Sequence, residues 1–257
     1  MSDPQVRHPG KFVWFEHLST DIPAASRFYE GLFGWHTEAM PMGEQRYSMI
    51  MNGADAIGGY FAAPAGVPPN WLAYLSVADV DASYAAALAA GASSRMAPMN
   101  VGEVGRAAVI TDPTGAAFAL WKSAQGDAPD VAQAPVSAFC WNELTTSDEA
   151  RALAFYERVF GYSHDTMDMG PMGNYYILKT GSTGRAGLMR TPAGGPPPMW
   201  LPYVAVADTD ACAAKAAKLG AQVMKPPQDI PGVGRFAILL DPLGAAIAVI
   251  KLLPAGG

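Results

Sequence analysis

The chain has 257 residues, of which 50% are hydrophobic and 16% are charged, so it can bury the cores of two globular domains. Its formal net charge of −6 comes without a cluster of Lys or Arg, which argues against a nucleic-acid surface and against a basic membrane-binding helix. We therefore expect a small-molecule ligand as the partner, with no nucleic acid and no membrane bound.

No apolar run approaches the ~18 residues of a transmembrane helix. The first residues, "MSDPQVRHPGK", lack the apolar centre of a signal peptide. We therefore expect a cytoplasmic protein. The two cysteines, Cys140 and Cys212, are too few for a disulfide framework or a zinc knuckle, and their small or apolar neighbours predict buried thiols.

The first predicted elements are a strand within "WFEHLST" and a helix that follows it. Apolar residues recur at helical spacing in this helix, Asp21 is a suitable N-cap, and Gly34 can end the helix in the left-handed conformation. Short segments punctuated by glycine, such as "RYSMIMNG", then predict antiparallel strands joined by tight turns. A Pro-rich connection, "PAGVPPNW", leads to a second strand and to an Ala-rich helix that begins near Asp79.

The second half of the chain repeats the first. The segment that begins at Trp14, "WFEHLSTDIPAASRFYEGLFGW", aligns with the one that begins at Trp141, "WNELTTSDEARALAFYERVFGY", at an offset of 127 residues (141 − 14). Further along, Trp71 aligns with Trp200 at an offset of 129 residues (200 − 71). The segment "GRAAVITDPTGAAFALWK" aligns with "GRFAILLDPLGAAIAVIK" at this same offset. We predict one domain over residues 8–123, a polar linker over 124–135 and a second domain over 136–253. Within each domain the order of strand, helix and about three strands occurs twice.

The order of these motifs resembles the vicinal oxygen chelate superfamily of glyoxalases, bleomycin-resistance proteins and extradiol dioxygenases. The resemblance rests on "D...A..FY...FGW" after the first strand and on "DP.G" before the last, and it covers nearly the whole chain. The tandem arrangement is similar to two-domain glyoxalase-like proteins, a mycobacterial antigen among them. The resemblance implies an α+β fold of four βαβββ modules in two tandem domains, whose sheets form open β cups.

Enzymes of this superfamily place metal ligands, His, Gln or Glu, on the opening and closing strands of their modules. Counting from the shared motifs gives eight corresponding positions in this chain. None of the eight carries a side chain that binds a divalent cation, and we therefore predict no metal site of the standard kind and no cofactor. These positions are Trp14, Gly59, Leu72, Ala119, Trp141, Gly187, Leu201 and Ala248.

Strand alternation predicts which other side chains face the cups, because residues two apart in a strand share a face. Each copy then offers one carboxylate among aromatic and small residues, which suits a small, flat, partly apolar ligand. The predicted ligand-binding residues on these strands are Trp14, Tyr74, Trp121, Trp141 and Tyr203, and the carboxylates are Glu16 and Glu143.

The role of Glu16 and Glu143 stays open among three alternatives. A carboxylate in an apolar cup has a raised pKa and could act as a general base, which makes both residues candidate catalytic groups. Alternatively, the two carboxylates orient a cationic or hydroxylated ligand. In the third alternative they hydrogen-bond a neighbouring Tyr hydroxyl or a backbone amide and do no chemistry.

Arg106 and Arg235, each within a "VGR" turn, are further candidates for ligand binding, because a guanidinium pairs with a carboxylate or phosphate in a fixed geometry. The alternative is that each arginine stabilises its own hairpin. His17 has the opposite strand parity from Glu16, and Leu144 replaces it in the second copy, so we expect a core or surface histidine and not a metal ligand.

Two functions follow from this pattern. The first is a monomer or homodimer that binds a small, partly apolar or aromatic molecule in its cups without the standard metal. The second is a glyoxalase-type lyase or a related oxygenase that uses displaced ligands or a Glu base. A structural protein with vestigial cups is the third alternative.

Overall fold

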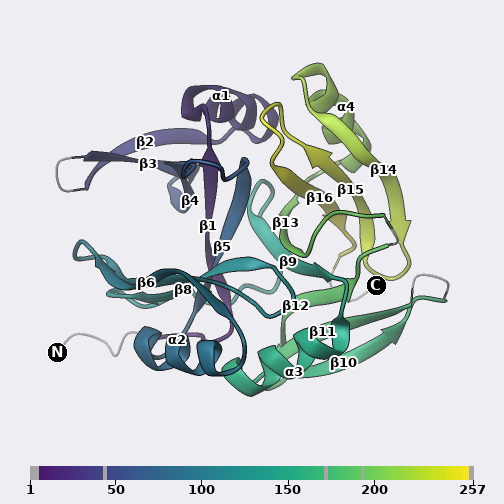
Figure 1. Ribbon diagram of the computed structural model, residues 1–257. Helices are drawn as coiled ribbons and strands as arrows, with labels where there is room; N and C mark the ends of the chain where they lie inside the picture. The colour runs from purple at the N-terminus through teal and green to yellow at the C-terminus, as the bar shows by residue number, and fades with distance from the viewer. Residues whose placement is uncertain (1–5, 43–44, 171–172, 193, 255–257) are drawn as a thin grey trace. The chain divides into compact units, whose positions relative to one another are not determined.

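The computed structural model describes residues 6–42, 45–170, 173–192 and 194–254 (Figure 1). Within these residues the order of one strand, one helix and three strands occurs four times, which confirms the predicted α+β fold of four βαβββ modules. The first module comprises β1 (Phe12–Ser19), α1 (Ile22–Phe33), β2 (His36–Met42), β3 (Gln45–Asn52) and β4 (Asp55–Ala62). The second comprises β5 (Asn70–Ser76), α2 (Val80–Ala89), β6 (Ser93–Val101), β7 (Gly105–Thr111) and β8 (Ala117–Ser123).

The second half of the chain contains two modules of the same kind. The third module comprises β9 (Phe139–Thr146), α3 (Glu149–Phe160), β10 (Ser163–Asp168), β11 (Asn174–Thr180) and β12 (Thr183–Arg190). The fourth comprises β13 (Met199–Ala205), α4 (Thr209–Lys218), β14 (Gln222–Ile230), β15 (Gly234–Leu240) and β16 (Ala246–Leu252).

Each half of the sequence contributes one eight-stranded mixed sheet. The strand orders are β2-β3-β4-β1-β5-β8-β7-β6 and β10-β11-β12-β9-β13-β16-β15-β14, so neither sheet is closed. The three strands after each helix are antiparallel, as predicted, and the last of them pairs in parallel with the opening strand of its module. This parallel pair brings the ends of each module, far apart in sequence, into direct register.

The helices begin and end where the sequence predicts. Asp21 caps α1 by accepting a hydrogen bond from the backbone of Ala24, and Gly34 ends it with a φ of 76°. In the third module Asp148 and Gly161 take the same two roles. An N-cap aspartate satisfies an amide that the helix itself leaves unpaired, and the left-handed φ suits glycine because it has no Cβ.

The contacts divide the chain into two compact units that differ from its two sequence copies. Unit 1 consists of Met1–Trp14, Leu72–Pro129 and Asn142–Trp200, and its helices α2 and α3 contact each other. Unit 2 consists of Phe15–Trp71, Asp130–Trp141 and Leu201–Gly257, and its helices α1 and α4 contact each other. Each unit therefore combines one module from each half of the sequence.

Each unit has its own aromatic core. In unit 1 the rings of Phe118, Tyr156 and Trp200 lie within 6.4 Å of one another, and in unit 2 those of Tyr29, Trp35 and Trp71 lie within 6.2 Å. All six side chains are at most 4% exposed. Burial of large rings with edge-to-face contacts is a main source of stability in cores of this kind.

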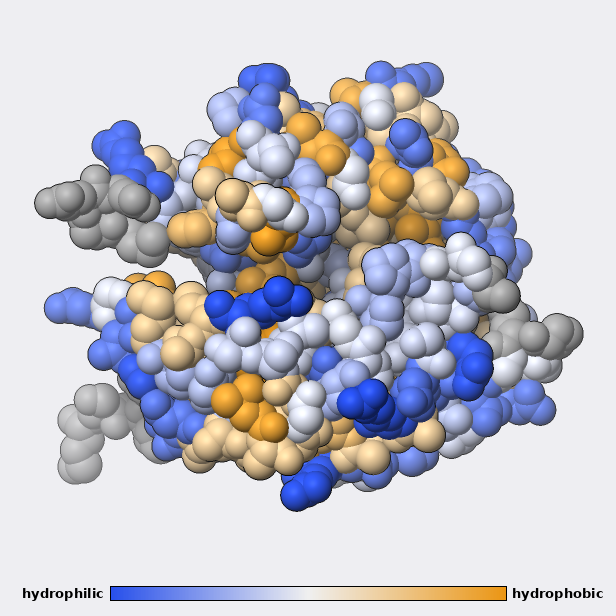
Figure 2. Space-filling model, in the orientation of Figure 1, coloured by the Kyte–Doolittle hydropathy of each residue, from blue (hydrophilic) through white to orange (hydrophobic). Residues whose placement is uncertain are grey.

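The surface carries exposed apolar side chains among hydrophilic ones, as the visible face in Figure 2 shows. Among the described residues, no helix is both long and apolar enough to cross a membrane. Cys212 is buried as predicted, whereas Cys140 is only half-buried and lies near the carbonyl of Tyr203. Burial raises the pKa of the Cys140 thiol to about 12 and that of Cys212 to about 11, so both thiols are protonated near neutral pH.

Candidate functional site

The Glu16 side chain is held within unit 2 by the register of three strands. In the parallel pair of β1 and β4, Glu16 lies opposite Gly59, and in the antiparallel pair of β3 and β4, Met49 lies opposite the same glycine. Tyr47 is two residues before Met49 and therefore shares this face. Its hydroxyl donates a hydrogen bond of 3.0 Å to Oε1 of Glu16. The Glu16 side chain is thus buried, with 8% exposure, beneath a half-buried tyrosine.

Gly59 provides the space for this arrangement. A Cβ atom at position 59 would overlap the hydroxyl and the ring carbon Cζ of Tyr47. The Tyr47 ring therefore extends across the backbone of Gly59 to reach Glu16. Position 59 is one of the eight predicted metal-ligand positions, and the Tyr47 side chain fills the space next to its backbone.

In unit 1, the backbone arrangement recurs in the third module. Glu143 on β9 lies opposite Gly187 on β12, and Ile177 on β11 lies opposite the same glycine. Tyr175, two residues before Ile177, is thereby the counterpart of Tyr47. Glu143 is 7% exposed, and Tyr175 is half-buried. The sequence alignment of the two copies placed Glu16 and Glu143 at equivalent positions, as the strand registers do. It did not identify Tyr47 and Tyr175, although the segments "RYSMIM" and "NYYILK" carry them at equivalent positions.

The other predicted aromatic residues lie beside the small residues of the closing strands. Tyr74 lies opposite Ala119, and its ring contacts that of Trp121 edge to face at 6.0 Å, within unit 1. In unit 2, Tyr203 lies opposite Ala248, is 4% exposed and contacts the ring of Phe236. Trp14 and Trp141, two of the eight positions predicted to correspond to metal ligands, are half-buried.

The residues at the eight metal-ligand positions do not fit a divalent cation. Glycine, alanine, leucine and tryptophan side chains supply no oxygen, sulfur or imidazole donor. Across residues 6–254, apart from the three gaps in the description, no three or more His, Cys, Asp or Glu side chains are grouped as a metal site requires. None of the eight positions predicted from the sequence therefore supplies a donor to a metal.

Arg106 and Arg235 are engaged with acidic groups on their own module. Nε and Nη2 of Arg106 bind both carboxylate oxygens of Asp81 on α2, at 2.6 and 2.7 Å. Arg235 binds Asp210 on α4 in the same way, at 2.6 and 2.9 Å, and Asp229 at 3.0 Å. These hydrogen bonds lower the pKa of the carboxyl groups of Asp81 and Asp210. Each arginine thus ties a helix to the neighbouring hairpin.

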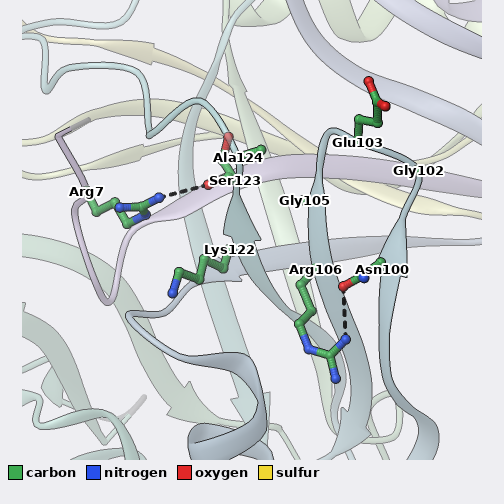
Figure 3. Close-up of a pocket in the computed structure, with 9 residues that line it drawn as sticks. All are labelled: Arg7, Asn100, Gly102, Glu103, Gly105, Arg106, Lys122, Ser123 and Ala124. Atoms are coloured by element: carbon green, nitrogen blue, oxygen red, sulfur yellow. Dashed lines mark hydrogen bonds between the residues drawn. The ribbon is translucent and has the colours of Figure 1, made fainter. Parts of the chain in front are cut away.

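Arg106 also lines a surface pocket of about 290 Å³ on unit 1 (Figure 3). Its Nη1 donates to Asn100 at 3.0 Å, while Arg7 on the N-terminal segment donates to the carbonyl of Ser123. Glu103, on the turn between β6 and β7, points away from these basic side chains. The pocket is lined by Arg7, Asn100, Gly102, Glu103, Gly105, Arg106, Lys122, Ser123 and Ala124.

The two "DP.G" turns join the halves of the sequence inside each unit. In unit 1, Asp112 accepts hydrogen bonds from the backbone of its own turn and, at Oδ2, from the hydroxyl of Tyr156 at 2.8 Å. Trp200 in turn donates to that hydroxyl at 3.0 Å. The Tyr of "FY" in one copy therefore meets the Asp of "DP.G" in the other. Burial is the main cause that raises the pKa of Tyr156, and the negative charge of Asp112 is the second. The hydroxyl therefore stays protonated and donates a hydrogen bond to Asp112.

Unit 2 repeats this network and adds a histidine. Asp241 accepts from Tyr29 at 3.0 Å and lies 2.8 Å from Nε2 of His17, and Trp71 donates to Tyr29 at 3.0 Å. His17 is fully buried, so of the two predicted locations, core and surface, it takes the core. Its Nδ1 has no hydrogen-bond partner among the described residues. Burial opposes the charged form of Asp241, but its hydrogen bonds with His17 and with the turn outweigh burial and lower its pKa.

The turn residue after the proline is a further difference between the units. In unit 1, the Thr114 hydroxyl donates to Asp112 at 2.8 Å, whereas Leu243 takes that turn position in unit 2 and has no hydroxyl. The imidazole of His17 contacts the other carboxylate oxygen of Asp241, Oδ2, at 2.8 Å. Both buried carboxylates thus keep several partners, as a charge removed from water requires.

Comparisons with known proteins agree with this fold. A family model described as the Glyoxalase/Bleomycin resistance protein/Dioxygenase superfamily matches residues 11–120 and again residues 138–249. The chain is 41% identical over 247 residues to CFP32 of Mycobacterium bovis, which carries the provisional name of a glyoxylase, with 94% of each chain covered. It is 33% identical over 264 residues to the anthracycline biosynthesis protein DauV of Streptomyces sp. strain C5, with 95% of this chain and 94% of that one covered.

Two solved structures illustrate the likeness in fold. The Mn(II)-bound glyoxalase from Novosphingobium aromaticivorans superposes with a TM-score of 0.64 at 18% identity, covering 96% of this chain and 82% of that one. An extradiol ring-cleaving dioxygenase from B. fuscum superposes with a TM-score of 0.67 at 13% identity, covering 100% of this chain and 76% of that one. At such identities the likeness concerns the fold and carries no argument about substrate.

Proposed function

Because the chain belongs to the glyoxalase/bleomycin resistance protein/dioxygenase superfamily, we propose that it binds a small, partly apolar or aromatic molecule without the standard metal site. The bound molecule lies in the predicted β cups. Apolar and aromatic walls supply the affinity there, and a few placed polar groups supply orientation. The polar groups in this proposal are the carboxylates of Glu16 and Glu143.

The observation that carries the proposal is the hydrogen bond from Tyr47 to Glu16 across Gly59. A buried carboxylate needs a hydrogen-bond donor, since an unpaired one costs several kcal/mol of solvation. Here the donor is a side-chain hydroxyl, and the neighbouring ligand position has no side chain at all. The arrangement therefore suits recognition of a neutral or cationic hydrogen-bond donor and not coordination of a cation by several anions.

A glyoxalase-type lyase or a related oxygenase is the alternative. The name of the CFP32 relatives favours it, because they are 41% identical to this chain over nearly its whole length. In that alternative Glu16 or Glu143 acts as a general base, or metal ligands come from positions other than the eight considered. The two functions differ in whether binding of the small molecule depends on a divalent metal.

Replacing each carboxylate by its amide tests the proposal. Small aromatic compounds are first screened by thermal shift on the intact protein, because a bound ligand raises the melting temperature. Binding of the hits is then measured by calorimetry. We expect Glu16→Gln and Glu143→Gln each to weaken binding at its own module by about 10- to 100-fold, which corresponds to the roughly 1.5–3 kcal/mol of a hydrogen bond to a charged group.

Glu38→Gln is the matched control. Glu38 lies on β2 of the same module as Glu16, is 54% exposed and pairs with His36 at the surface. This variant should bind every hit as the unmodified protein does. Equal affinities in all four proteins would remove Glu16 and Glu143 from the site and refute the proposal.

A further inference from the structure

The surface pocket of unit 1 lies outside the predicted cup. Arg106 on β7 is opposite Lys122 on β8, so both have the opposite strand parity from Trp121, which is predicted to face the cup. The hydrogen bonds from Arg106 to Asp81 on α2 show that this is the helix-bearing face of the sheet. A molecule bound in this pocket therefore does not compete with a ligand in the cup.

Positive charge gathers in this pocket (Figure 3). Three cationic side chains line it, Arg7, Arg106 and Lys122, and the one carboxylate in the lining, Glu103, points away from them. Asp81 offsets the charge of Arg106. Lys122, by contrast, is half-buried and forms no ion pair or side-chain hydrogen bond with the part of the chain that the structure describes. Its charge is therefore left to attract an anion.

The corresponding place in unit 2 is neutralised by the chain itself. At the repeat offset of 129 residues (229 − 100), Asp229 stands where unit 1 has Asn100. Each accepts a hydrogen bond of 3.0 Å from Nη1 of its arginine. Arg235 thus pairs with two carboxylates, whereas Arg106 pairs with one. In addition, the Asn100 amide has an NH₂ group that can donate to an anion, which a carboxylate cannot do.

The N-terminal segment adds a second difference between the units. Seven residues before Trp14 the chain has Arg7, and seven residues before Trp141 it has Ala134. The guanidinium of Arg7 donates to the carbonyl of Ser123 and lines the pocket at the same time. A cation at the pocket of unit 1 thus has an uncharged counterpart in unit 2, so both differences make the pocket of unit 1 the more positive of the two.

We propose that this pocket binds the phosphate group of a small molecule, held by the Lys122 ammonium, the Asn100 amide and the positive field of Arg7 and Arg106. A phosphate monoester carries nearly twice the charge of a carboxylate and has three strong acceptor oxygens, which suits several donors at once. The volume of about 290 Å³ is at the lower end of the range for small-molecule pockets. The inference is separate from the proposed function, because no cup residue takes part.

Calorimetric titration of the full chain with three probes tests the proposal: inorganic phosphate, glycerol 3-phosphate and acetate. The titrations are made at about pH 7.5, where a phosphate monoester is mainly dianionic, and at low and constant ionic strength, because salt screens charges at the surface. We expect both phosphates to bind at least about fivefold more tightly than acetate. Equal affinities of the two phosphates, or tighter binding of glycerol 3-phosphate, both support recognition of the phosphate group.

Asn100→Asp is the sharpest variant, because it introduces the residue that unit 2 has at this place. The new carboxylate should pair with Arg106 as Asp229 pairs with Arg235, and the fold should be kept. Binding of both phosphates should weaken at least about tenfold, because the pocket gains a negative charge and loses an amide donor. The melting temperature of the variant shows whether it is folded.

A pair of lysine variants completes the test. Lys122→Gln removes the cation and should weaken binding of both phosphates at least about tenfold. Lys251→Gln is the matched control, because Lys251 is opposite Arg235 on β15 as Lys122 is opposite Arg106 on β7. This control should bind both phosphates as the unmodified protein does.

The proposal is overturned if neither phosphate binds, if acetate binds as tightly as the phosphates, or if Asn100→Asp and Lys122→Gln both keep the affinity of the unmodified protein. Glu16→Gln and Glu143→Gln should bind phosphate unchanged. Loss of phosphate binding in either of these two variants would place the anion in a cup and would also contradict the proposal. Failure of ligand binding in the cups, in contrast, leaves the phosphate result unaffected.

Discussion

Replacing Asp241 by Ala is expected to lower the free energy of unfolding by about 3–5 kcal/mol, because several buried polar groups lose their acceptor at once, at roughly 1–3 kcal/mol each. The carboxylate is 3% exposed and accepts hydrogen bonds from Tyr29 and from the backbone amides of Leu243 and Ala245, with His17 at 2.8 Å. The Ala variant leaves all of these polar groups buried without their acceptor. Urea unfolding followed by circular dichroism measures the loss.

Two aspartates provide matched comparisons. Asp112→Ala removes the corresponding carboxylate of unit 1 and should cost a similar amount, because Asp112 also accepts from a tyrosine and from its own turn. Asp208→Ala removes an exposed N-cap of α4 and should cost only about 1 kcal/mol. If Asp241→Ala destabilises the protein no more than Asp208→Ala does, the buried networks do not hold the halves of the sequence together.

The adjacent glycines Gly58 and Gly59 are expected to respond very differently to the same substitution. In Gly58→Ala the new methyl group would overlap the backbone carbonyl of Phe15, so β4 must move away from β1. Overpacking of this kind costs about 1–3 kcal/mol. In Gly59→Ala the new methyl group meets the free end of the Tyr47 side chain, which can rotate away at a smaller cost.

The measurement is a thermal or urea unfolding curve for each variant. Gly58→Ala should show the larger loss of stability. Gly59→Ala should lose the hydrogen bond between Tyr47 and Glu16, but the ring that moves away opens Glu16 to water, so the loss of stability should be smaller than in Gly58→Ala. Equal destabilisation by the two variants would mean that the Tyr47 side chain cannot rotate away from position 59, and would contradict this prediction.

Local sequence features predicted most of the fold. The N-cap aspartates, the C-terminal glycines and the internal repeat each act over a few residues or through direct comparison of the copies, so Asp21, Gly34 and the four-module order could be inferred without a structure. The side-by-side position of Glu16 and Gly59 could not, because it depends on the parallel pairing of strands about forty residues apart.

The buried networks escaped the sequence analysis for a similar reason. The sequence "DP.G" is typical of a turn, and the turn does use Asp112, but the second oxygen of Asp112 accepts from Tyr156 of the other copy. No local pattern indicates that an Asp in one copy meets a Tyr in the other. His17 was assigned to core or surface from its strand parity alone, and its pairing with Asp241 required the fold.

The central claim is that binding depends on Glu16 and not on a divalent metal. The most direct measurement is the metal content of native protein, purified without chelator or affinity tag, together with calorimetric binding of the best screened ligand before and after chelation. We predict no stoichiometric divalent metal, and binding that survives chelation but is weakened in Glu16→Gln. One equivalent of zinc, nickel, manganese or iron, whose removal abolishes binding and whose return restores it, would contradict this account.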